Sequence, residues 1–148
     1  AAARDGARLV DDSYNANPGS LAAALAWLAT QSGPRWAALG DMGELGDQTI
    51  SAHEQAGHEA RAAGVSRLFV TGAAGRATAD TFGDGAEWFA DRESLIVALT
   101  EALAQARTEG APIVLVKGSR SAGMDHVAAA LSPRAHEMSH ESSADSPC

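Results

Sequence analysis

Short runs of apolar and β-branched residues alternate along the chain with segments in which apolar residues recur at helical spacing. The runs that predict strands are Arg8–Asp12, Trp36–Leu39, Arg67–Thr71, Glu87–Ala90 and Ile113–Val116. A helical pattern follows each of them, and this order is typical of domains in which helices join parallel strands. We therefore expect a single α/β domain, with a mostly parallel sheet of about five to six strands and helices on both faces.

The helices can be placed from their capping residues and their apolar spacing. The first is expected to begin at Asn17-Pro18, a capping residue followed by a proline in the first turn. Its apolar stripe consists of Leu21, Leu25 and Leu28. Further helices are predicted over residues 50–63, 75–82 and 92–109, and from about residue 122 onward. After Leu131 the sequence is polar and aperiodic, so the domain should cover residues 1–131 and residues 132–148 should form a disordered tail.

Composition and charge exclude several classes of protein. Hydrophobic residues make up 45% of the 148 residues, enough for one folded core. The net charge is −8, without a run of Lys or Arg, so neither nucleic acid nor a membrane surface is expected as a partner. No apolar run approaches the ~20 residues of a membrane span, and the first ten residues do not resemble a secretory signal. The single cysteine, Cys148, excludes an internal disulfide, and we expect a cytoplasmic protein.

Three polar stretches each follow a predicted strand. They are DDSYNANP (residues 11–18), GDMGELG (40–46) and KGSRSAGM (117–124). If the strands are parallel, all three stretches lie at the carboxyl edge of one sheet, which is where open α/β sheets bind their ligands. The coincidence of three such stretches predicts a ligand site more strongly than any one of them.

The first stretch offers groups that suit a nucleotide. The carboxylate of Asp12 can accept hydrogen bonds from both hydroxyls of a ribose, and the Tyr14 ring or the Asn15 amide can hold a base. Asp12 and Asn15 can equally well shape the turn, and Asn17 can cap the following helix. For Asp12 and Tyr14 together we favour ligand binding, whereas the cap alone would explain Asn17.

The second and third stretches supply charges of opposite sign. GDMGELG carries Asp41 and Glu44 among glycines. It lacks the G-x-G-x-x-G spacing of a nicotinamide site, and a flexible loop without a ligand is an equally good interpretation. KGSRSAGM carries Lys117, Ser119 and Arg120 between a strand and a helix, a setting that suits a carboxylate or a phosphate. It is not a Walker loop, because Lys117 precedes the glycine.

The remaining candidate residues are interpreted as structural. His53 and His58 lie five residues apart, about 140° around a helix, so they cannot share a metal ion, and His53 is expected on a helix surface or at an interface. His136 and His140 should be solvated in the tail. Three tryptophans are expected to pack in the interior, namely Trp27, Trp36 and Trp88. No serine has a recognisable His and Asp partner for a hydrolase triad.

Taken together, DDSYNANPGS, LGDMGELG, the His and Gly of SAHEQAG, and LVKGSRSAGM resemble the carboxyl-terminal domain of the Mur ligases. The motifs occur in the family's order and span residues 8–131. The resemblance implies a Rossmann-like domain of an ATP-dependent amide ligase in cytoplasmic peptidoglycan synthesis. Within the family, the motifs are most similar to those of ligases that add D-alanyl-D-alanine to UDP-N-acetylmuramoyl-tripeptide.

The resemblance also implies a role for each polar stretch. The residues expected near the nucleotide are Asp12, which would meet the ATP ribose, and Tyr14, Asn15 and Asn17. The residues expected to face the incoming dipeptide are Asp41, Glu44, Lys117, Ser119 and Arg120. The UDP-sugar domain and the central domain, which carries the P-loop and the Mg²⁺ ligands, are expected outside this chain. Alone, the chain should therefore fold but not catalyse ligation.

Two alternatives remain open. The first is a Mur-type ligase with another acceptor, such as a free amino acid or glutamate, which the specific sequence GDMGELG disfavours. The second is a stand-alone nucleotide-binding module without catalysis. A native start methionine near Ala1 would favour that module, and a long upstream reading frame would contradict it.

Overall fold

A five-stranded parallel sheet forms the centre of the computed structural model, which describes residues 1–133. The strands are β1 (Arg8–Asp12), β2 (Arg35–Leu39), β3 (Arg67–Thr71), β4 (Ala86–Phe89) and β5 (Ile113–Lys117). Their spatial order is β1-β5-β2-β3-β4, and every neighbouring pair is parallel. The predicted α/β class is confirmed, and each strand lies within one residue of its predicted bounds. Most of the predicted tail lies outside the described residues.

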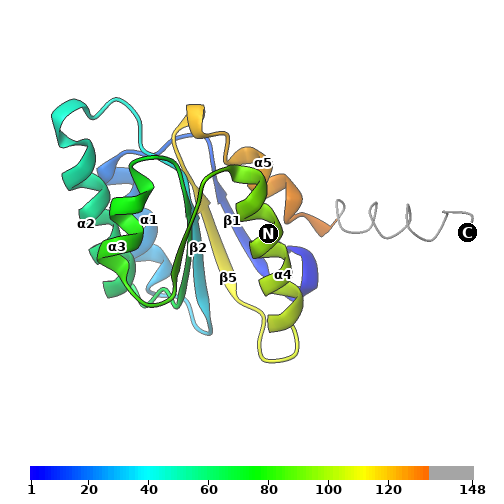
Figure 1. Ribbon diagram of the computed structural model, residues 1–148. Helices are drawn as coiled ribbons and strands as arrows, with labels where there is room; N and C mark the ends of the chain where they lie inside the picture. The colour runs from blue at the N-terminus through cyan, green and yellow to red at the C-terminus, as the bar shows by residue number, and fades with distance from the viewer. Residues whose placement is uncertain (134–148) are drawn as a thin grey trace, which may run out of the picture.

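Within residues 1–133 five α-helices connect the strands. They are α1 (Pro18–Leu28), α2 (Thr49–Ala62), α3 (Gly75–Phe82), α4 (Arg92–Ala106) and α5 (Asp125–Ala130), with short 3-10 turns η1 (Arg4–Gly6), η2 (Gly46–Gln48) and η3 (Arg120–Ala122). Helices α1, α2 and α3 cover one face of the sheet, and α4 and α5 cover the other (Figure 1). The last predicted helix begins later than expected, because Gly123 adopts a left-handed φ of 66° and separates η3 from α5.

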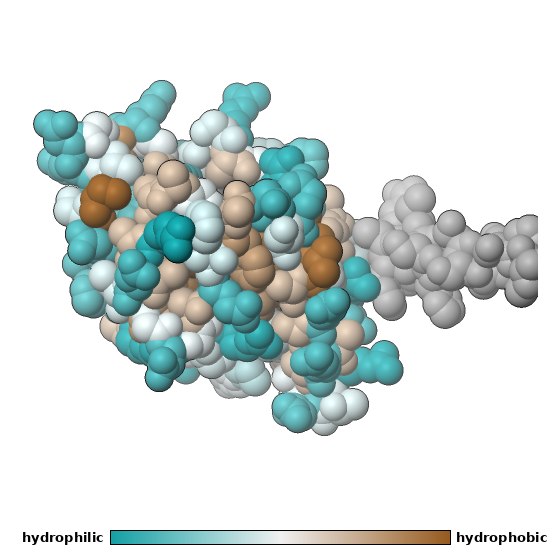
Figure 2. Space-filling view, in the orientation of Figure 1, coloured by the Kyte–Doolittle hydropathy of each residue, from teal (hydrophilic) through white to brown (hydrophobic). Residues whose placement is uncertain are grey.

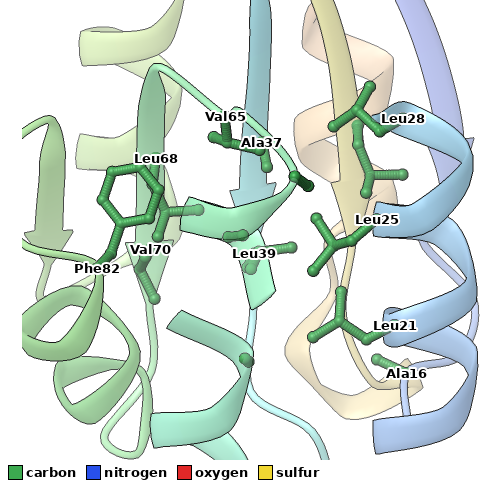
Figure 3. Close-up of a cluster of buried hydrophobic side chains, with 14 of the residues drawn as sticks. Ala16, Leu21, Leu25, Leu28, Ala37, Leu39, Val65, Leu68, Val70 and Phe82 are labelled. Carbon is green, nitrogen blue, oxygen red and sulfur yellow. The ribbon is translucent and has the colours of Figure 1, made fainter. Parts of the chain in front are cut away.

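Alternating strand residues supply two separate cores, because successive side chains of a strand point to opposite faces of the sheet. On one face the predicted leucine stripe of α1 packs against strand residues that include Ala37, Leu39, Leu68 and Val70 (Figure 3). The opposite core includes Trp36, Ala38, Phe69, Val114 and Val116, which pack under α4 and α5. The central strands are thus buried on both faces, as is usual in parallel sheets.

Side-chain caps explain where two of the helices begin. Asn17 Oδ1 accepts a hydrogen bond from the Ser20 N–H at 2.8 Å, and Ser20 Oγ accepts one from the Asn17 N–H at 3.1 Å, which together form a capping box at α1. Asp91 caps α4 by accepting the Ser94 N–H at 2.7 Å. This backbone hydrogen bond, with a smaller contribution from the Ser94 side chain, lowers the pKa of the exposed Asp91 carboxyl.

The strand order brings three loops together at one edge of the sheet. The chain advances from β1 to β4 through α1, α2 and α3 on one face, then returns through α4 on the other face and inserts β5 between β1 and β2. The loop after β5 therefore leaves the sheet in the opposite direction from the loops after β1 and β2. A switch of this kind opens a crevice at the carboxyl ends of the strands. In Figure 1 these loops lie at the top of the sheet.

A glycine allows α2 to pack closely on α3. A Cβ atom at Gly57 would overlap the Thr81 hydroxyl and the Thr78 backbone oxygen. Two hydrogen bonds of 2.8 Å cross the same contact, from Thr78 Oγ1 to the His53 carbonyl and from Thr81 Oγ1 to the Glu54 carbonyl. The first turns of α2, which border the loop after β2, are thereby fixed against α3.

Gly57→Ala should destabilise the chain, because the added methyl group overlaps backbone as well as side-chain atoms of α3. We expect a loss of about 1–3 kcal/mol, the usual cost of overpacking, measured by urea unfolding. The matched control is Gly19→Ala in α1, where the nearest atom to an added Cβ is Asn17 Oδ1 at 3.5 Å. The control should unfold at or above the parent midpoint, and equal midpoints for the two variants would contradict the close contact.

Candidate functional site

A buried lysine joins the ends of β1 and β5. Asp12 and Lys117 are register partners, and Lys117 Nζ lies 2.6 Å from Asp12 Oδ2. The Lys117 side chain is 1% exposed, whereas that of Asp12 is 48% exposed. Lys117 Nζ also donates a hydrogen bond to the Asn15 carbonyl at 2.9 Å. The ammonium therefore fixes the loop after β1 to the end of β5, and it orients a carboxylate that solvent can still reach.

The burial of Lys117 follows from its place in the strand. Its side chain points to the same face as those of Ile113 and Leu115, beneath α1 and α2. There it lines a cavity of about 10 Å³ whose other residues include Leu21, Leu39, Met42 and His53. A lysine is rarely buried this fully without a partner, and Asp12 and the Asn15 carbonyl supply one. That Lys117 faces the incoming dipeptide stays a prediction; in this structure its ammonium is engaged by Asp12 and the Asn15 carbonyl.

The predicted nucleotide residues fall into two groups. Tyr14 is 72% exposed, and Asn15 lines a cavity at the sheet edge, so both are accessible in the loop that follows Asp12. The Asn17 side chain is engaged in the cap of α1. A buried neighbour, Ser13, donates its N–H to Asp11 Oδ1 at 3.2 Å, which shapes the turn after β1.

Asp41 connects three segments of the chain. Its carboxylate accepts hydrogen bonds from the Gly75 N–H at 2.9 Å and the Ala74 N–H at 3.3 Å, where α3 begins. A carboxylate in this position is stabilised by the unpaired N–H groups of the first helical turn. Its backbone carbonyl accepts the Ser119 N–H at 2.9 Å. Asp41 therefore holds the loop after β2 against both α3 and the loop after β5.

A cavity of about 420 Å³ lies between the loops after β1, β2 and β5. The residues that line it include Asn15, Gly43, Glu44, Ser119, Arg120 and Ser121. Glu44 has a φ of 60°, a left-handed conformation that is uncommon for residues other than glycine and that occurs often at ligand sites. Glu44 and Arg120 place an anion and a cation on the wall of one space. That combination suits a ligand with both a cationic and an anionic end.

A second cavity of about 320 Å³ lies beside the first. Ser119 and Ser121 line both cavities, and their hydroxyl oxygens are 3.1 Å apart. Asp41 lines the second cavity together with Arg92 at the start of α4. The structure thus separates the predicted acceptor residues. Glu44, Ser119 and Arg120 line the first cavity together, and Asp41 lines the second cavity, on the other side of the two serines. Lys117 lies beneath α1.

The described residues show neither a metal-binding cluster nor a membrane-spanning helix. Among residues 1–133 no group of three or more His, Cys, Asp or Glu side chains is arranged to hold a metal ion. Over the same range, each helix is too short or too polar to cross a membrane.

The prediction for His53 is wrong. The residue was expected at a helix surface or an interface, but it is 2% exposed. Its ring points from the first turns of α2 toward the loop after β2, where Nε2 accepts a hydrogen bond from the Met42 N–H at 3.0 Å. The position of His53 in the LGDMGELG…H…G pattern is the signal that could have revealed this contact.

The tryptophans behave differently from one another. Trp36 is buried as predicted, and Trp88 is partly buried and donates its indole N–H to the Gly72 carbonyl at 2.8 Å. Trp27, also expected to pack, is 46% exposed, because it lies outside the leucine stripe that faces the sheet.

The strongly apolar residues on the face shown in Figure 2 appear as separate spots among polar ones. His136 and His140 lie outside the described residues.

Comparison with known proteins identifies the family. Residues 1–120 match the family described as "Mur ligase, glutamate ligase domain". The chain belongs to this Mur ligase family. The fold and the family expected from the sequence are therefore both confirmed.

Two relatives with sequence identities above 40% have the same name. The chain is 44% identical over 123 residues to the UDP-N-acetylmuramoyl-tripeptide–D-alanyl-D-alanine ligase of Escherichia coli (strain K12), covering 83% of this chain and 26% of the relative. It is 42% identical over 147 residues to the ligase of that name from Mycobacterium tuberculosis (strain CDC 1551 / Oshkosh), covering 86% and 29%. The chain thus spans about a quarter of the length of these Mur ligases.

Solved structures of Mur ligases share the fold. A crystal structure of MurF from Acinetobacter baumannii superposes with a TM-score of 0.75 at 28% identity, covering 82% of this chain and 27% of the neighbour. MurF from Thermotoga maritima, solved in complex with ADP, superposes with a TM-score of 0.70 over 84% of this chain and 28% of its own. At 23% identity the latter similarity concerns the fold alone.

Asp12→Asn should destabilise the chain more than Lys117→Met. The first change leaves a buried ammonium without its anionic partner, whereas the second leaves a carboxylate that water can hydrate. For Asp12→Asn we expect a loss of about 1.5–3 kcal/mol in the free energy of unfolding by urea, since Lys117 keeps the Asn15 carbonyl, and for Lys117→Met less than half of that. Asp11→Asn is the control and should be near neutral. A larger loss for Lys117→Met would contradict this account of the pair.

Proposed function

We propose that this chain is the carboxyl-terminal domain of a cytoplasmic, ATP-dependent ligase that adds D-alanyl-D-alanine to UDP-N-acetylmuramoyl-tripeptide in peptidoglycan synthesis. The observation that carries the proposal is the 420 Å³ cavity with Glu44 and Arg120 on its wall, beside the half-exposed carboxylate of Asp12. The names of relatives at 42–44% identity support the same function. The net charge of −8 supports small molecules rather than nucleic acid or a membrane surface as partners.

The nucleotide is assigned to the loop after β1. Asp12 can accept hydrogen bonds from the ribose hydroxyls of ATP, and Lys117 keeps its carboxylate in one orientation. The exposed ring of Tyr14 offers a surface for the base, and Asn15 offers amide groups beside it. The ADP in the Thermotoga maritima neighbour supports a nucleotide in this family. The triphosphate and Mg²⁺ are assigned to the central domain, which we expect outside this chain.

The acceptor is assigned to the cavity between the loops. D-Alanyl-D-alanine carries an ammonium at one end and a carboxylate at the other, and its amine must be free to attack an acyl phosphate. Arg120 can hold the carboxylate through paired hydrogen bonds, with the hydroxyls of Ser119 and Ser121 beside it. Glu44 attracts the ammonium end and can accept its proton. Orienting the amine in this way removes much of the entropic barrier to its attack.

A second candidate acceptor follows from the family description, which refers to a glutamate ligase domain. Glutamate also has an ammonium and a carboxylate, but its second carboxylate would lie near Glu44 in this cavity. We therefore favour the dipeptide.

The direct test is an acceptor screen. The complete ligase that contains this chain would be given ATP, Mg²⁺ and UDP-N-acetylmuramoyl-tripeptide with D-alanyl-D-alanine, D-alanine or D-glutamate in turn. We expect phosphate release and a ligated product, identified by mass, only when D-alanyl-D-alanine is the acceptor. The chain of residues 1–148 is the control and should show no turnover, since positioning by the other domains supplies up to about 7–11 kcal/mol of such a reaction's acceleration. A product with glutamate and none with the dipeptide would establish the second candidate.

Asp12→Asn in the complete ligase should raise the KM for ATP with little change in the KM for the dipeptide. An amide accepts the ribose hydroxyls less strongly than a carboxylate does, and the loss of a charge-assisted hydrogen bond of about 1.5–3 kcal/mol corresponds to roughly a tenfold to hundredfold rise. Steady-state kinetics with each substrate varied in turn would measure it. An unchanged KM for ATP with intact turnover would remove Asp12 from the nucleotide site.

Arg120→Ala should have the opposite selectivity. Removal of the guanidinium takes away the cation assigned to the dipeptide carboxylate, so the KM for D-alanyl-D-alanine should rise about tenfold or more while the KM for ATP stays within about twofold. The matched control is Arg8→Ala, an exposed arginine at the opposite end of β1. If Arg120→Ala uses the dipeptide as well as the control does, another residue anchors the carboxylate.

A further inference from the structure

We propose that His53 is a positioning residue of the acceptor site. Its neutral imidazole, protonated on Nδ1, clamps both ends of the loop over residues 43–48 and so holds Glu44 at the wall of the 420 Å³ cavity. The inference rests on the proposed function only where it names the dipeptide as the ligand of that cavity. His53 itself lies behind the loop and contacts no substrate in this proposal.

The hydrogen bonds of His53 determine which nitrogen carries the proton. The backbone N–H of Met42 can only donate, so Nε2, 3.0 Å away, must present its lone pair. The proton is therefore on Nδ1, which lies 2.6 Å from the Thr49 carbonyl and donates to it. Both ring nitrogens are satisfied in the neutral form, and the separation of 3.8 Å between Nε2 and Asp41 Oδ1 is not an ion pair in this state.

The two partners of His53 flank residues 43–48. Met42 lies three residues after the end of β2 and Thr49 is the first residue of α2, so a single imidazole links the two residues on either side of this segment. The loop contains Glu44 at its left-handed φ of 60°. Backbone conformations of this kind persist only where the surroundings enforce them. The hydrogen bond from the Met42 N–H to His53 restrains the backbone two residues before Glu44.

The base of the clamp is rigid. The His53 carbonyl accepts a hydrogen bond from Thr78 Oγ1 at 2.8 Å, and Gly57, one turn later, allows α2 to approach α3. On the other side of Met42, the Asp41 carboxylate is bound to the start of α3. Helix α3 thus fixes both His53 and the residue before Met42. A shift of the imidazole would have to break several of these contacts at once.

The first test uses the unaltered chain and NMR of its histidine nitrogens. We expect a protonated Nδ1, a bare Nε2, and a coupling across the hydrogen bond between the Met42 amide nitrogen and Nε2. A histidine protonated on Nε2 would overturn the proposal, because that nitrogen could not accept the Met42 N–H. This test needs no substitution and is independent of how well a variant folds.

The second test compares His53→Gln with His53→Asn in the complete ligase. The Gln amide oxygen can take the place of Nε2 and accept the Met42 N–H, whereas the Asn amide can take the place of Nδ1 and reach only the Thr49 carbonyl. We expect His53→Asn to speed hydrogen exchange at the Met42 amide by about tenfold and to raise the KM for the dipeptide by a similar factor. His53→Gln should bring both the exchange rate at Met42 and the KM for the dipeptide most of the way back to the parent values. Neither variant should change the KM for ATP by more than about twofold. His58→Asn, an exposed histidine on the same helix, is the control.

The outcomes separate this inference from the proposed function. Equal behaviour of the Gln and Asn variants would overturn the inference, because the hydrogen bond to Met42 would then not be responsible. Faster exchange at Met42 without a change in the KM for the acceptor would also overturn it, because the loop would then not control the site. If the acceptor screen identifies a substrate other than the dipeptide, the proposed function fails, and the same comparison of KM values is made with that substrate.

Discussion

A buried ammonium group must have a counter-charge, and that requirement organises the carboxyl edge of this sheet. Lys117 ends β5 on the face that packs against α1, so its charge is enclosed by apolar side chains. Asp12 at the end of the neighbouring strand provides the anion, and the Asn15 carbonyl provides a second acceptor. The loop after β1 is consequently fixed to the end of β5. That ion pair and the hydrogen bond to Asn15 thus set the position of Asp12 and Asn15 in the loop.

The polar residues at the sheet edge divide into those that hold loops and those that remain accessible. Lys117, Asp41 and His53 have their charges or lone pairs engaged by other segments of the chain. Glu44 and Arg120 are exposed and line a cavity. The first group fixes the segments that carry the second, since Asp41 and His53 hold the loop after β2 and the Asp41 carbonyl holds Ser119, next to Arg120.

Much of the fold could be predicted from the sequence, because local patterns determine it. The alternation of strand and helix signals, the cap at Asn17 and the leucines of α1 all depend on residues within one or two turns. The roles of Lys117 and His53 depend on partners elsewhere in the chain, and Lys117 meets Asp12 across 105 residues. From its neighbours in the sequence alone, Lys117 is predicted to be an accessible cation at the end of a strand. Only the insertion of β5 between β1 and β2 shows that its side chain turns inward.

The same insertion has a consequence for the order of assembly. The strand at the junction of the sheet is the last of the five to be synthesised, and β1 and β2 have no contact in the ladder until it lies between them. A nascent chain that ends before Ile113 can form the β2-β3-β4 part of the sheet, but β1 then has no neighbouring strand. Closing a contact across so many residues is entropically costly and slow. The part of the crevice beside β1 therefore cannot form until β5 has left the ribosome.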